Sequence, residues 1–138
     1  MDFSEKVRVS NERNSFIRHN GITLVEMRED YARVEAHLTR ESRNLFQAVH
    51  GGMFFTMADS AAGSAARTNG MRYVTVSSSF EFYRNTDGDY LVAEGHIKHR
   101  GRTICVAEAE VRDGAGKLLC GGTFTLYCTG SLDDVPPD

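Results

Sequence analysis

Apolar and polar positions change their period several times along the chain, and each change marks an expected element. Residues 4–19 mix charges with a few apolar anchors, and Asn20-Gly21 follows them as a helix stop. This pattern predicts a short N-terminal helix within residues 1–20. Between residues 22 and 38 apolar and polar side chains alternate around a turn-like Glu29-Asp30 pair, which predicts a β-hairpin.

The segment MFFTMADSAAGSAAR, residues 53–67, has no alternation and reads as about four turns of helix that end at Thr68-Asn69-Gly70. Its many alanines give the expected helix a thin surface, which a curved sheet can wrap closely. The alternative is that alanine simply favours helix formation.

After this helix the chain consists of alternating runs joined by short, glycine-containing connections. In the first run Val74, Val76, Phe80 and Phe82 share one face, which we expect to be buried. The runs cover residues 72–83, 89–99, 102–113 and 117–128. They predict an antiparallel meander, and the whole order predicts a single α+β domain over residues 1–138. The acidic, proline-containing tail, residues 129–138, is expected to be frayed.

Composition narrows the class of protein. The net charge is −3 and the positive residues are scattered, which disfavours nucleic-acid binding. The three cysteines are odd in number and lack zinc-ligand spacing, which predicts reduced thiols and no metal site. The N-terminus is charged throughout, and no segment approaches the ~20 apolar residues of a membrane span. We therefore expect a cytoplasmic protein that does not bind membranes.

His50-Gly51-Gly52 stands directly before the long helix. Backbone N–H groups at a helix start are unpaired and lie at its positive end, so they can polarise a carbonyl oxygen. These residues are a candidate oxyanion hole. The alternative is that the glycines only allow a tight turn into the helix.

Asp59 lies in the middle of the same helix among phenylalanine and alanine neighbours, with no cation within one turn. A carboxylate in apolar surroundings is expected to have a raised pKa and to act as a general base or nucleophile. The alternative places Asp59 on a solvated stripe of the helix beside Thr56 and Ser60.

The order of Asn44, His50-Gly51-Gly52 and Ala58-Asp59 in NLFQAVHGGMFFTMADSAAGSAA resembles the motif of hotdog-fold acyl-CoA thioesterases of the phenylacetate-degradation type. The segment LVAEGHIKHRGRTICVAEAEVRDGAGKLLCGGTFTL resembles the second half of that family, so the resemblance covers residues 20–128. It implies the hotdog fold, an antiparallel sheet wrapped around one long helix. It also implies homodimers, often paired into homotetramers.

The resemblance also implies roles for individual residues. The Gly51 N–H and the Asn44 side chain would polarise the thioester carbonyl, while His50 shapes their loop. Asp59 would activate water or attack the carbonyl carbon directly. Thr75 stands where many relatives have a serine that helps to hold the water, and the alternative is an ordinary strand threonine.

Basic side chains near the expected strand ends are candidates for contacting the phosphates of coenzyme A. The alternative is that they are ordinary solvated surface charges. The predicted substrate-binding residues are Gly52, Arg84, His99, Arg100, Gly101 and Arg102, with Lys98 nearby.

Together these features predict hydrolysis of an aryl- or medium-chain acyl-CoA to a free acid and coenzyme A, without a metal or redox cofactor. The helix start and Asp59 are separated by ~10 Å along the helix, too far to act on one carbonyl. A second subunit must therefore supply one of them.

Two other functions stay open at this stage. A hotdog hydratase or dehydratase would use His50 and Asp59 for proton transfer, although its usual proline-rich histidine loop is missing from the sequence. A non-catalytic acyl-CoA binder would keep the fold and the pocket without turnover.

Overall fold

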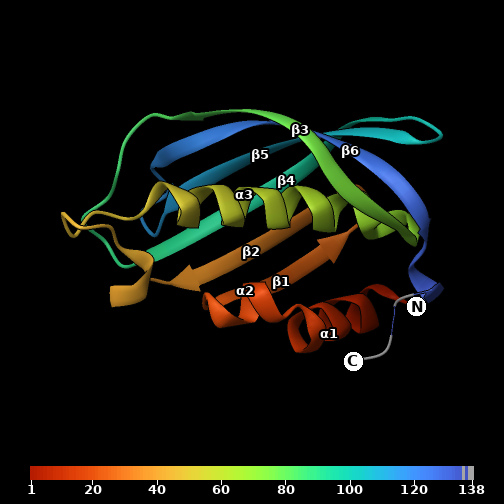
Figure 1. The fold of residues 1–138 in the computed structure, drawn as a ribbon, viewed down its shortest axis with the longest axis horizontal. Helices are drawn as coiled ribbons and strands as arrows, with labels where there is room; N and C mark the ends of the chain where they lie inside the picture. The colour runs from red at the N-terminus through yellow and green to blue at the C-terminus, as the bar shows by residue number, and fades with distance from the viewer. Residues whose placement is uncertain (135, 137–138) are drawn as a thin grey trace.

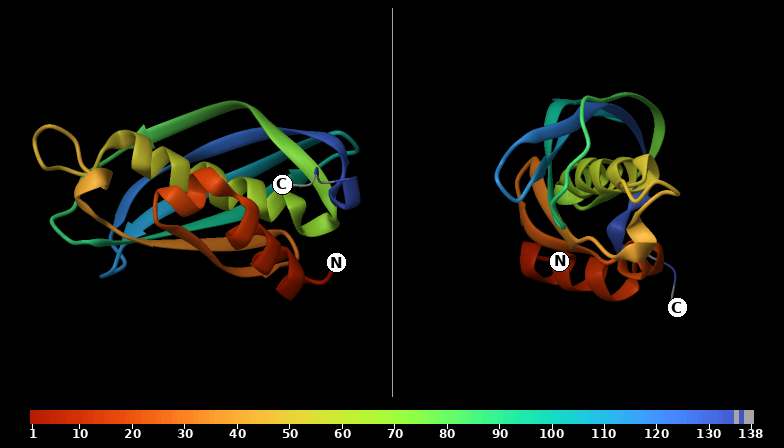
Figure 2. Two further views of the ribbon diagram at one scale, coloured as in Figure 1. Left: turned by 60° about the horizontal axis from the view of Figure 1, so that its bottom comes forward. Right: turned by 90° about the vertical axis from the view of Figure 1, so that its left-hand side faces the viewer.

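The computed structural model describes residues 1–134 and 136. In this part of the chain six antiparallel strands form one sheet in the order β1-β2-β4-β5-β6-β3. The strands are β1 Ile22–Arg28, β2 Tyr31–His37, β3 Met71–Phe82, β4 Tyr90–Arg100, β5 Ile104–Asp113 and β6 Leu118–Ser131. The sheet curves around one long helix, α3 Gly51–Ala66, as the end-on view in Figure 2 shows. The expected α+β hotdog arrangement is confirmed.

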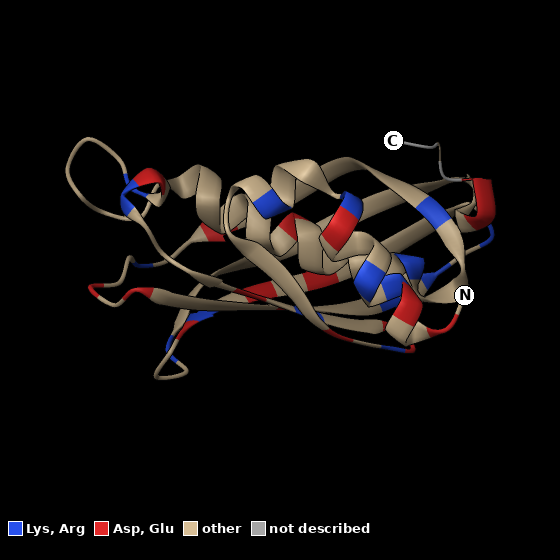
Figure 3. Ribbon diagram, turned by 90° about the horizontal axis from the view of Figure 1, so that it is seen from below, with Lys and Arg blue, Asp and Glu red and all other residues tan. Residues whose placement is uncertain are grey.

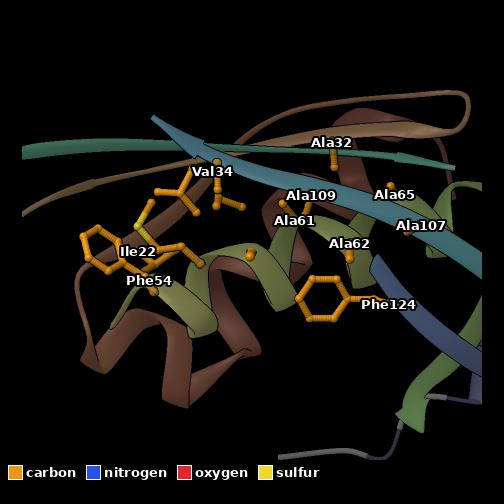
Figure 4. Close-up of a cluster of buried hydrophobic side chains, with 14 of the residues drawn as sticks. Ile22, Ala32, Val34, Phe54, Ala61, Ala62, Ala65, Ala107, Ala109 and Phe124 are labelled. Carbon is orange, nitrogen blue, oxygen red and sulfur yellow. The ribbon is translucent and has the colours of Figure 1, made fainter. Parts of the chain in front are cut away.

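The helix α3 lies in the concave side of the sheet (Figure 1). Its alanines, including Ala61, Ala62 and Ala65, are fully buried against strand residues such as Ala109 and Phe124 (Figure 4). Small side chains are required here because β4 crosses the helix closely. A Cβ atom on Gly95 would lie 2.5 Å from the Ala61 carbonyl oxygen. The thin helix predicted from the sequence is therefore the one that the sheet wraps.

The N-terminal segment forms two helices where one was expected, α1 Phe3–Arg13 and α2 Ser15–His19. The break occurs because the Asn14 side chain accepts a hydrogen bond from Ile17 N, 3.4 Å away, and so caps α2. α1 packs along the edge strand β1. There the Asn11 side-chain amide pairs with both backbone groups of Leu24, at 2.8 Å each. This edge of the sheet is thereby covered.

The expectation of a four-strand meander is wrong for β3. This strand pairs with β6, with Phe82 opposite Cys120, and the loop of residues 83–89 carries the chain from the sheet edge to β4 in the interior. Strands β4, β5 and β6 do form consecutive antiparallel pairs. This connection places β3 beside β6 at the edge of an open sheet, whereas a simple meander would place it beside β4.

The expected burial of one apolar face of β3 is also wrong for three of its four residues, although Phe80 packs against the core. Val74, Val76 and Phe82 are 50%, 57% and 54% exposed. An irregularity between Thr75 and Ser77 inserts an extra residue and shifts the alternation, so that Thr75 lies on the side facing α3. β3 is also an edge strand, so within the described part of the chain no neighbouring strand covers its outer side.

The C-terminal tail is ordered further than expected. β6 continues to Ser131, and residues 132–134 form a single 3-10 turn in which Leu132 N donates to Gly70 O at 3.0 Å. Residues 135, 137 and 138 of the expected frayed tail lie outside the described residues. Among the described residues, no helix has the length and apolar character needed to cross a membrane.

Candidate active site

Asp59 and Thr75, both singled out from the sequence, contact each other. The Thr75 hydroxyl donates to Asp59 Oδ1 at 2.6 Å, linking the middle of α3 to the edge strand β3. Asp59 Oδ2 accepts no hydrogen bond from the described residues. The carboxylate is therefore held at one oxygen and available at the other, which is the arrangement a general base or nucleophile requires.

At the start of α3, the His50 side chain determines which backbone N–H group, that of Gly51 or that of Gly52, is available as a donor. His50 Nδ1 accepts from Gly52 N at 2.8 Å and so caps the helix. A Cβ atom on Gly52 would lie only 3.0 Å from this nitrogen, so a larger residue would displace the His50 ring. The Gly51 N–H has no acceptor among the described residues. Gly51 is thus the free donor, whereas Gly52 has a capping role.

Asn44 shapes the loop before α3. Its Oδ1 accepts from Phe46 N at 2.9 Å and from Ala48 N at 3.1 Å, around Gln47 with a left-handed φ of 67°. The Asn44 Nδ2 group makes no hydrogen bond within the described residues. It is therefore a second available donor.

Asn85 is a positioning residue that sequence reasoning missed. Its Oδ1 accepts from Val49 N at 3.1 Å and its Nδ2 donates to Val49 O at 3.0 Å. These bonds fix the backbone directly before His50. No local signal points to Asn85, because it lies 36 positions from Val49 in the sequence.

Within one chain, Gly51 and the Asp59 carboxylate lie beside different parts of β3. A Cβ atom on Gly51 would be 3.5 Å from the Phe82 ring at the end of this strand, whereas Asp59 bonds Thr75 near its beginning. Gly51 and Asp59 are eight positions apart on α3, which corresponds to ~12 Å along the helix. The two groups cannot polarise and attack the same carbonyl from one chain.

Arg67 is a second residue that the sequence analysis missed. From the end of α3 its side chain folds back along the helix, and a Cβ atom on Gly63 would lie 3.1 Å from its Nη1. Burial lowers the pKa of the Arg67 guanidinium, and the Asp59 carboxylate opposes that shift. The expectation that Asp59 has purely apolar surroundings is therefore wrong. The stripe formed by residues 59, 63 and 67, spaced four apart, is the signal that could have found Arg67.

The residues predicted to contact coenzyme A do not gather in one chain. Arg84 N donates to Leu119 O, whereas Thr103 O, in the β4–β5 turn next to the predicted residues 98–102, accepts from Cys128 N. Leu119 and Cys128 are nine residues apart on β6, which is ~30 Å. The predicted single cluster is therefore wrong for an isolated chain.

At the end of β4 and in the turn after it, one arginine has a structural role and the other predicted side chains are exposed. Arg100 donates to Asp30 Oδ1 at 2.9 and 3.1 Å and to the carbonyl oxygens of Ala65 and Ala66. It holds the end of α3, so we exclude it from the candidate coenzyme A contacts. His99 and Arg102 are exposed, and Gly101 N closes the turn by donating to Ile104 O at 2.8 Å.

Comparison with known proteins identifies the family. Residues 46–120 match the model of the thioesterase superfamily, and the chain belongs to this family. It is 30% identical over 115 residues to the acyl-coenzyme A thioesterase PaaI of Escherichia coli K12, covering 76% of this chain and 82% of that protein. A putative esterase of Archaeoglobus fulgidus is also 30% identical over 115 residues, covering 83% of this chain and 73% of that protein.

Solved structures confirm the fold. The structure of E. coli PaaI matches with a TM-score of 0.87 and 23% identity over 93% of this chain and 94% of that one. A hypothetical thioesterase from Streptococcus pneumoniae, solved with coenzyme A, matches with a TM-score of 0.79 and 27% identity over 88% and 98% of the two chains. The chain is thus a hotdog-fold thioesterase of the PaaI type.

Proposed function

We propose that the protein hydrolyses acyl-CoA thioesters to a free acid and coenzyme A. The observation that carries this proposal is the 2.6 Å hydrogen bond from Thr75 to Asp59, which fixes a carboxylate with one available oxygen on the face of α3. The coenzyme A bound to the S. pneumoniae thioesterase supports the choice of thioester. The proposed reaction uses no metal or redox cofactor.

In this reaction the thioester oxygen accepts hydrogen bonds from the Gly51 N–H and the Asn44 Nδ2 group. These two donors stabilise the negative charge that develops as the carbonyl carbon becomes tetrahedral. Asp59 either accepts a proton from the attacking water or attacks to form an anhydride that water then cleaves. By both routes the carbon–sulfur bond breaks and the coenzyme A thiol leaves.

The free edge of β3 supports a site shared between two copies of the chain. If two β3 strands pair antiparallel about an axis near Ser78, Phe82 lies opposite Val74 of the partner subunit. Gly51 beside Phe82 then approaches Thr75 of the partner subunit and the carboxylate that it holds. The active unit in this proposal is therefore a homodimer.

A further apolar surface supports pairing of two dimers. On the side of the sheet facing away from α3, Ile104, Tyr127 and Val74 are exposed and lie side by side across β5, β6 and β3. A contiguous apolar row is typical of a protein–protein contact. We infer that this row is covered in a homotetramer.

The hydratase alternative is disfavoured by His50. Its Nδ1 is occupied by the helix cap to Gly52 N, and the ring is therefore fixed as a structural group.

The acyl group and the compartment follow from other residues. Phe55 and Ile17 form aromatic and aliphatic walls beside Asp59, and these walls suit aryl or medium-chain acyl groups. We place the reaction in the cytoplasm, the reducing compartment where the free thiols of Cys105, Cys120 and Cys128 would persist.

A thiol-release assay over aryl, short-, medium- and long-chain acyl-CoAs tests the activity directly. Release of coenzyme A thiol with at least one class is expected. A change in enoyl absorbance without thiol release would instead identify a hydratase. Tight binding of acyl-CoA without any turnover would identify a binding protein.

Mixing two inactive variants tests the shared site. Asp59→Ala and Asn44→Ala subunits, reassorted after reversible dissociation, form about half mixed dimers. In a mixed dimer one site carries both changes and the other carries neither, so activity should recover to about a quarter of the parent value. Recovery to no more than the average of the two variants, with exchange verified by mass spectrometry, would show that both residues act from one chain.

A further inference from the structure

A cavity leads away from the candidate carboxylate along the face of α3. Asp59 lines a space of about 390 Å³ between α2 and α3, together with Phe55, Ile17 and Arg67. Asn14 and Arg67 also line a second space of about 590 Å³, which lies between α1 and the ends of β3 and β6. Arg67 therefore stands where the two cavities meet.

The larger cavity is strongly cationic. Lys6, Arg13, Arg67 and Arg72 all line it, and none of its described lining residues is acidic. Figure 3 shows blue and red segments interspersed on α1 near the N-terminus, so the positive character belongs to the cavity lining and not to the whole helix. A cavity whose described lining residues carry several positive charges favours an anionic occupant.

The Arg67 guanidinium feels the charge of the Asp59 carboxylate but is not hydrogen-bonded to it or to any other described carboxylate. Among the described residues its side chain makes one hydrogen bond, from Nη2 to Ser64 Oγ at 3.1 Å. The side chain is half-buried. A guanidinium matches a carboxylate with two parallel hydrogen bonds, so the N–H groups that Ser64 does not engage are suited to an anion in the cavity.

We propose that Arg67 binds a carboxylate at the far end of the acyl group, so that the preferred substrates are coenzyme A monothioesters of dicarboxylic acids. This inference rests on the proposed thioesterase function and names its substrate class. Nη1 of Arg67 lies over Gly63, four residues and thus ~6 Å along the helix from Asp59. A short methylene chain along Phe55 and Ile17 spans that distance.

The phosphates of coenzyme A are a poorer match for Arg67. The pantetheine arm holds the phosphates many bonds from the thioester. Arg67, however, lies about one helical turn from Asp59, the carboxylate that acts on the thioester. An acyl group, by contrast, begins at the thioester carbonyl beside Asp59. Its far end is the part of the substrate that reaches Arg67.

The test compares adipoyl-CoA with hexanoyl-CoA, which differ in the terminal carboxylate. For the parent enzyme we expect kcat/KM to be at least about tenfold higher for adipoyl-CoA. Arg67→Gln should lower this ratio by roughly 10 to 100-fold, and Arg67→Lys should retain much of it. Arg8→Gln, which removes the same charge from an exposed pair with Glu12 away from the cavity, should leave the ratio unchanged.

Each outcome decides a separate question. Failure to hydrolyse any acyl-CoA would overturn the proposed function. Hydrolysis of both substrates with a ratio near one, or a ratio unaffected by Arg67→Gln, would overturn only the present inference. An equal loss with both substrates and weaker inhibition by free coenzyme A would assign Arg67 to the phosphates and also overturn it.

A measurement on the unaltered protein keeps the inference testable if the variants do not fold. Adipate and hexanoate are the product acids of the two substrates and can be compared as inhibitors of the parent enzyme. Inhibition at least about tenfold tighter by adipate would support a carboxylate site at Arg67. Equal inhibition constants would contradict it.

Discussion

The donor half and the carboxylate half of the candidate site are built in different ways. The donor half, Asn44 with His50 and Gly51, is a loop held largely by bonds to near neighbours, such as those from Phe46 N and Ala48 N to the Asn44 side chain. The carboxylate half depends on one contact between a helix and a strand, from Thr75 to Asp59 across 16 positions. A local loop keeps its geometry in each subunit, whereas the carboxylate half depends on the register of β3. The two halves therefore call for different tests.

The largest effect is expected in the carboxylate half. Asp59→Asn is nearly isosteric but removes basicity, so kcat should fall by at least ~100-fold while the thermal unfolding midpoint changes little. The measurement is thiol release with the best substrate of the parent enzyme. Asp87→Asn, in the exposed loop between β3 and β4, is the matched control and should retain full activity. More than half of the parent kcat in Asp59→Asn would remove Asp59 from the mechanism.

A smaller effect is expected in the donor half. Asn44→Ala should lower kcat by roughly 10 to 100-fold, because the Gly51 N–H still holds the developing oxyanion. Asn44→Asp separates the two tasks of this side chain. It keeps an oxygen for Phe46 N and Ala48 N but loses the Nδ2 donor, so it should be at least as impaired as Asn44→Ala. An active Asn44→Asp variant would mean that Asn44 only shapes the loop.

The same contrast explains what could be predicted from the sequence. Most helices and strands, the thin central helix, and the placement of His50 before that helix and of Asp59 in its middle could be predicted. They follow from hydrophobic periodicity, composition and residue spacing, which are local properties of the sequence. The irregularity between Thr75 and Ser77 could not be predicted, because it arises from the pairing of β3 with β6 and reverses which side chains face the helix.

Two other features depend on contacts made only in the folded chain. Arg100 resembled a surface cation in the sequence, but the fold brings it against Asp30 and the end of α3. Asn85 is close to Val49 only because the β3–β4 loop returns past the start of α3. In each case the chemistry of the side chain was evident and its partner was not.

The smallest effect is expected at the contact that links α3 to β3. Thr75→Val keeps the shape of the side chain but removes the hydroxyl that donates to Asp59 Oδ1. One hydrogen bond to a carboxylate orients the group without creating its basicity, so kcat should fall by roughly 3 to 20-fold, well short of the Asp59→Asn loss. Thr125→Val makes the same chemical change on β6, beside Ser77, and should leave kcat unaltered.

If Thr75→Val were as inactive as Asp59→Asn with its fold intact, Thr75 would hold the reacting water itself. If it matched Thr125→Val, the carboxylate would need no support from β3, and the register of this strand would matter only for assembly of the dimer.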